Sequence, residues 1–137
     1  MNINWDIQIE TGIREIDEQH KYLATLIAGY IEDAKNEQDK FAISKKIDKL
    51  YVYAINHFKT EESYMNYMTY PEYYRQVKAH IACLEHIMEC KKKIIDKNEC
   101  SFKNFLQFAV DWFKTHTCEL DSTLRSHFVK ESIIEDK

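Results

Sequence analysis

Four histidines and one glutamate stand at positions where the surrounding pattern calls for apolar side chains. His20, His80 and His116 each fall within a series of apolar residues spaced by three and four, which is typical of one face of a helix. His57 and Glu61 belong to another such series, and their spacing of four residues places them one turn apart on the same side of a helix. The sequence therefore predicts polar side chains buried on four separate helices.

Imidazole and carboxylate groups in such positions could bind metal ions. A lone histidine on an apolar face is more often a hydrogen-bonded core residue, but burying several polar groups without a common partner is costly. A metal between the helices would satisfy them all, and imidazole with carboxylate suits iron, and also manganese or zinc. Asp121 is a further candidate, although it lies about 140° round a regular helix from His116. A wide turn or a helix end near Asp121 would be needed to aim both inward.

The elements that must position these residues are four helices and an N-terminal arm. We expect the arm over residues 1 to about 11 and helices over about 14–35, 41–65 and 72–96, with a fourth from about 102 toward 128 in one or two pieces. The first helix could begin at Arg14 or Asp17, and Ser101 could cap the fourth. Because the polar breaks are short, consecutive helices should pack as antiparallel neighbours. The predicted fold is all-α, an antiparallel up-and-down four-helix bundle with an N-terminal arm.

The composition fits this fold and argues against several classes of protein. The chain of 137 residues has two glycines and one proline, too few turn formers for many short strands. Its net charge of −4 gives no attraction to nucleic acid or anionic lipid. No apolar run is long enough to span a membrane and no signal peptide is recognisable, so we expect a cytoplasmic protein. We expect reduced thiols at Cys83, Cys90, Cys100 and Cys118, and no feature sets an oligomeric state.

The chain resembles the bacterial hemerythrins in nearly its whole length. The resemblance rests on Ile-Asp-Glu-Gln-His-Lys-Tyr-Leu at 16–23, on His-Phe-Lys-Thr-Glu-Glu-Ser-Tyr-Met at 57–65 and on Tyr-Pro at 70–71 followed by His80. It also includes Trp-Phe-Lys-Thr-His at 112–116, followed by Asp121. The combination is specific, and it implies a single hemerythrin-like domain over residues 1–137.

The resemblance also implies a non-haem di-iron centre in the bundle core. One iron would be bound by His20 and His57, and the other by His80 and His116. Glu61 and Asp121 would bridge the two ions together with an oxo or hydroxo group, and dioxygen would be the ligand.

Other side chains are expected around this centre. Asp17 would orient a ligand imidazole or cap its helix rather than bind metal. The apolar wall around dioxygen would be formed by Leu23, Phe58, Trp112 and Phe113, a role compatible with ordinary core packing. Glu62 should point out of the bundle into solvent, and His86 and His127 should lie at the surface or rim.

The chain departs from the family pattern at Gln76, where the family has a further histidine four residues before the one that matches His80. An amide oxygen is a weaker ligand than imidazole. Three outcomes are open. Gln76 or a water completes the site, a neighbour such as Glu72, Tyr73 or Cys83 takes its place, or the iron at His80 binds weakly.

The leading hypothesis is a protein that binds dioxygen reversibly for storage, delivery or scavenging. A second hypothesis is an enzyme, a di-iron reductase of dioxygen or peroxide, which is favoured if Gln76 opens a coordination position. A third is a module that senses oxygen or handles iron.

Overall fold

The computed structural model describes residues 11–36, 38–116 and 122–130, and every regular element in these ranges is an α-helix. The helices are α1 (Arg14–Asp33), α2 (Lys40–Tyr67), α3 (Tyr73–Ile95), α4 (Phe102–Thr115) and α5 (Ser122–Lys130). The bounds differ from the predicted ones by one or two residues, the usual uncertainty at helix ends. The predicted arm lies outside the described residues, except for Thr11.

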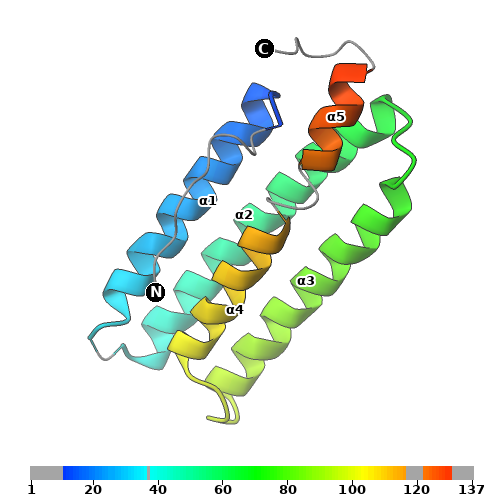
Figure 1. Cartoon of the computed structure of the whole chain (residues 1–137). Coiled ribbons are helices and arrows are strands. Elements are labelled where there is room, and N and C mark those ends of the chain that lie inside the picture. The colour runs from blue at the N-terminus through cyan, green and yellow to red at the C-terminus, as the bar shows by residue number, and fades with distance from the viewer. Residues whose placement is uncertain (1–10, 37, 117–121, 131–137) are drawn as a thin grey trace.

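Helices α1 to α4 lie side by side and alternate in direction (Figure 1). Helix α5 sits at one end of this bundle, beside the connection between α2 and α3, where His127 Nε2 lies 3.3 Å from the carbonyl oxygen of Met68. The antiparallel up-and-down four-helix bundle predicted from the sequence is therefore confirmed. Its fourth helical segment is in two pieces, α4 and α5.

The helix ends follow from local side-chain chemistry. The side chain of Asp39 accepts a hydrogen bond from the backbone of Ala42 at 2.7 Å, and Ser101 accepts one from Asn104 at 3.1 Å. Each satisfies a backbone N–H that the first turn of a helix leaves unpaired, so Ser101 caps α4 as predicted.

Helix α2 ends in a Schellman motif. The backbone N–H of Tyr70 bonds to the carbonyl oxygen of Met65 at 2.9 Å, and that of Thr69 bonds to the carbonyl oxygen of Asn66 at 3.1 Å. Thr69 occupies the position that usually carries glycine, with φ of 53°. A β-branched residue is strained in this left-handed conformation.

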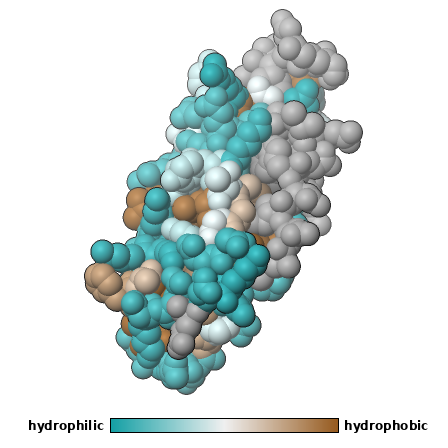
Figure 2. Space-filling view, turned by 90° about the vertical axis from the view of Figure 1, so that its left-hand side faces the viewer, coloured by the Kyte–Doolittle hydropathy of each residue, from teal (hydrophilic) through white to brown (hydrophobic). Residues whose placement is uncertain are grey.

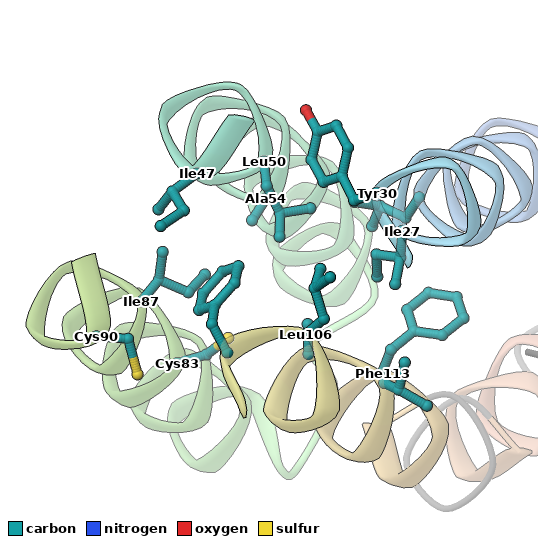
Figure 3. Close-up of a cluster of buried hydrophobic side chains, with 14 of the residues drawn as sticks. Ile27, Tyr30, Ile47, Leu50, Ala54, Cys83, Ile87, Cys90, Leu106 and Phe113 are labelled. Carbon is teal, nitrogen blue, oxygen red and sulfur yellow. The ribbon is translucent and has the colours of Figure 1, made fainter. Parts of the chain in front are cut away.

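The apolar core is divided into two clusters. The larger one is formed by α1 to α4, and Figure 3 shows side chains from all four helices, such as Ile27, Leu50, Ile87 and Leu106, in the space between them. The smaller one lies at the end of the bundle that carries α5 and consists of Ile13, Ile16, Met65, Tyr70 and Leu124.

A layer of buried polar side chains separates these clusters. Along α1, His20 lies between Ile16 of the smaller cluster and Leu23 of the larger one. Along α2, Glu61 lies between Met65 of the smaller cluster and Phe58 of the larger one. The layer is therefore enclosed by apolar side chains above and below.

The outer surface is mainly polar on the side that carries α1, where brown side chains are few among the teal ones (Figure 2). Within the described residues, no helix combines the length and the apolar character needed to cross a membrane.

Replacing Thr69 by glycine should stabilise the fold. Glycine adopts the left-handed conformation without the steric cost that threonine pays there, so we expect Thr69→Gly to raise the free energy of unfolding by about 0.5–1 kcal/mol. Urea denaturation would measure it. The matched control is Thr25→Gly within α1, where the same exchange should destabilise the protein by a similar amount. A loss of stability in both variants would contradict this account.

Candidate metal centre

Glu61 lies at the middle of the polar layer and is fully buried. Its Oε1 lies 3.0 Å from His116 Nε2, and 3.3 Å from the Nε2 atoms of His57 and of His80. Its Oε2 lies 3.8 Å from His20 Nε2. Imidazoles from α1, α2, α3 and the end of α4 thus converge on one carboxylate.

The same atoms form two groups that could each hold a cation. One group consists of His20, His57 and Glu61, and the other of Glu61, His80 and His116. Within each group the ligand atoms lie within 4.8 Å of one another. Because Glu61 belongs to both, the geometry is that of two neighbouring cation sites with a shared carboxylate.

The end of α4 brings His116 into this layer. The helix ends at Thr115, His116 follows as its C-cap, and α5 begins at Ser122. The wide turn or helix end that the sequence requires near Asp121 stays a prediction. Asp121 itself lies outside the described residues.

The imidazole rings of His57 and His80 each form a hydrogen bond through Nδ1, the nitrogen that faces away from Glu61, and this bond fixes the orientation of Nε2. His57 Nδ1 donates to the side-chain oxygen of Gln19 at 2.9 Å, and Gln19 in turn donates to Thr60 Oγ1 at 3.1 Å. His80 Nδ1 donates to Glu62 Oε2 at 2.7 Å. With the proton on Nδ1, each ring keeps the lone pair of Nε2 directed at the centre, as a metal ligand requires.

The expectation that Glu62 points into solvent is wrong. Its side chain is only 26% exposed and holds His80. Phe58, one turn before Glu62, stacks on the same ring with centroids 4.0 Å apart and an angle of 4°. This spacing of four residues is the sequence signal that both face α3. Gln19 was also missed, and no pattern in the sequence distinguishes it.

Burial and charge set the protonation of the centre. Burial lowers the pKa of His57 to about 3, against the opposing effect of Glu61, so the ring is neutral near pH 7. Burial alone would raise the pKa of Glu61, but the facing imidazole of His116 holds it well below its usual range. The carboxylate is therefore ionised in the interior, where it needs positive charge nearby.

The residues of this layer fit metal ions. His57 Nε2, His80 Nε2 and Gln76 Oε1 are buried and have no hydrogen-bond partner in the part of the chain that the structure describes. Buried polar atoms in native proteins are nearly always paired, so unpaired atoms around an ionised carboxylate indicate a missing common partner. Imidazole nitrogen with carboxylate and amide oxygen is a donor set for iron, manganese or zinc.

An apolar cavity of about 40 Å³ adjoins His57 and His116. Its walls include the side chains predicted for the apolar wall: Leu23, Phe58, Trp112 and Phe113. Trp112 stacks on His116, with centroids 4.5 Å apart and an angle of 14°. The cavity exceeds the roughly 10–15 Å³ that a water needs, but apolar cavities of this kind stay dry. It has room for a small apolar molecule beside the imidazoles.

The carboxylate of Asp17 forms its hydrogen bonds outside the polar layer. It accepts hydrogen bonds from Thr11 N and Thr11 Oγ1, both at 2.8 Å, and from Gly12 N at 2.9 Å. These bonds hold the turn that leads into α1, whose N-cap residue, Ile13, forms no side-chain capping bond, so the capping role predicted for Asp17 is not seen. His86 is exposed and His127 is half-buried, as expected for surface or rim residues.

Known proteins share this pattern. Residues 11–128 match the hemerythrin family, described as the "Hemerythrin HHE cation binding domain". The chain is 31% identical over 121 residues to a bacteriohemerythrin from Clostridium acetobutylicum, which covers 85% of this chain and 94% of that protein. It is also 31% identical over 85 residues to a bacteriohemerythrin from Pseudomonas aeruginosa, which covers 62% of this chain and 55% of that protein.

Replacing Glu62 by glutamine should weaken cation binding without removing a ligand. Loss of the carboxylate that holds His80 should cost about 10–100-fold in cation affinity, because outer hydrogen-bond partners orient ligand imidazoles and raise their basicity. Competition with a chelator would measure the affinity. Glu89→Gln, on the surface of α3, is the control. Equal affinities in both variants would show that Glu62 has no such role.

Proposed function

This chain belongs to the hemerythrin family, and we propose that it binds dioxygen reversibly at a non-haem di-iron centre in the core of the bundle. The observation that carries the proposal is the apolar cavity of about 40 Å³ that adjoins His57 and His116. It would place a small apolar ligand directly beside the metal-binding layer.

Each group of ligands would hold one iron. His20 and His57 would bind one ion, His80 and His116 the other, and Glu61 would be shared between them. Asp121 and an oxo or hydroxo group are proposed as the other bridges. A ferrous pair of this kind supplies the electrons that make dioxygen binding reversible.

The chain's own residues would shape the ligand site. Phe58 and Trp112 stack on His80 and His116, which keeps these rings from turning away from the centre. The same two side chains are in contact, with centroids 5.3 Å apart, and close the cavity on the side of α2 and α4. Apolar walls exclude water and protons, which favours release of dioxygen unchanged.

Binding and release would serve storage, delivery or scavenging of dioxygen. We also propose that residues 1–137 form one domain and that it works in the cytoplasm, which is supported by free thiols at Cys83, Cys90 and Cys100.

Iron loading followed by exposure to dioxygen tests this function. Protein loaded with ferrous iron without oxygen should contain two ions per chain, and its absorbance should change when oxygen is admitted and return when oxygen is removed. Steady consumption of dioxygen with an added reductant would instead favour a reductase. Binding of fewer than two ions, or no reversible change, would contradict the proposal.

Filling the cavity should impair oxygen binding while iron binding persists. Ala109→Val adds two methyl groups where Ala109 lines the cavity, and we expect a lower affinity for dioxygen, about 1–3 kcal/mol less stability, and still two ions per chain. Ala82→Val, at an exposed position of α3, is the matched control and should bind oxygen normally. Unchanged oxygen affinity in Ala109→Val would show that the cavity is not the ligand site.

A further inference from the structure

We infer that Gln76 is itself a metal ligand, and that its side-chain oxygen donates to the cation held by His80 and His116. This rests on the di-metal centre proposed above. It would make the two halves of the centre chemically different, with an exchangeable oxygen donor on one side only.

The position of Gln76 carries the inference. It lies on α3, one helical turn before His80, and both side chains belong to the buried face of that helix. Gln76 is 2% exposed and His80 is 1% exposed. The two side chains therefore enter the polar layer from the same helix face.

Among the described residues, none donates a hydrogen bond to the side-chain oxygen of Gln76. Oε1 is buried and lacks a hydrogen-bond partner, a state that costs a neutral amide free energy on folding. His80 Nε2, one turn away, shares this state. A cation bound by both atoms would give each of them a partner, whereas an ordinary core amide would already have a hydrogen-bond donor for its oxygen.

The neighbours that could replace Gln76 are engaged elsewhere. The Glu72 side chain is 49% exposed and lies 3.7 Å from Arg75. The ring of Tyr73 packs against Tyr74 and the smaller apolar cluster. Cys83 lines the apolar cavity, and burial raises the pKa of its thiol to about 12, so it stays protonated.

The donor atoms around His80 and His116 predict how tightly this half of the centre binds its cation. Each half has two imidazoles and a share of Glu61, and the half of His80 adds a neutral amide oxygen, a weaker donor than imidazole for iron. The carboxylate of Glu62 on His80 Nδ1 makes that imidazole a stronger donor and offsets part of the deficit. We expect loss of the amide oxygen to weaken cation binding in this half alone, and an imidazole in its place to strengthen it.

The test compares Gln76→Leu and Gln76→His with the wild type, using ferrous iron under argon and a competing chelator. In Gln76→Leu one of the two ions, the one at His80 and His116, should bind about tenfold more weakly or worse than in the wild type, while in Gln76→His it should bind about tenfold more tightly. Metal-free Gln76→Leu should melt at the same temperature as the wild type or about 2–4 °C higher, because it removes an unpaired buried oxygen.

The opposite signs of these effects separate a ligand from a structural amide. If Gln76 only supports the core, Gln76→Leu lowers the melting temperature of the metal-free protein and leaves the affinity for each of the two ions at its wild-type value. That result would overturn the inference. Gln107→Leu, at an exposed position of α4, is the matched control and should change neither quantity. If the wild type fails to take up two ions, the proposed function itself fails. That result differs from one in which the wild type binds two ions and Gln76→Leu binds both with wild-type affinity, which overturns only the inference about Gln76.

Discussion

The structure depends on one ionised carboxylate held inside an apolar bundle. Glu61 is fully buried, and a charge in that place is tolerated only where positive charge or strong donors surround it. Four Nε2 atoms lie within 3.8 Å of its oxygens, each from a different segment of the chain, and cations bound by them would supply that positive charge. The alternation of the helices, the end of α4 at Thr115 and the hydrogen bonds of Gln19 and Glu62 all serve to bring these atoms to one level.

Apolar packing isolates this layer from water. The larger cluster closes it on one side and the smaller cluster, with Leu124 of α5, closes it on the other. Aromatic stacking does more than fill space, because Phe58 and Trp112 lie flat against His80 and His116. A ring held from its face by an aromatic neighbour and, in the case of His80, from its Nδ1 by a hydrogen bond has little freedom to reorient.

The polar layer could be predicted from the sequence for two reasons. A helix repeats every 3.6 residues, so His57 and Glu61 had to share a face. In addition, His20, His80 and His116 each interrupt a series of apolar residues, which places them on buried helix faces. Glu62 was placed wrongly because one residue is a rotation of about 100°. Whether that rotation leads to solvent or to a neighbouring helix depends on how α2 packs against α3, which periodicity alone does not fix. Gln19 was missed for a related reason, since its partner His57 lies 38 residues away.

The unequal size of the two apolar clusters bears on how the protein assembles. The larger cluster draws on α1, α2, α3 and α4 and needs no ion to pack, so hydrophobic burial can bring the helices together while the polar layer is still hydrated. The smaller cluster and α5 lie beyond that layer and close over it. A cation approaching the layer along the bundle axis would therefore meet fewer apolar side chains at the α5 end than at the opposite end.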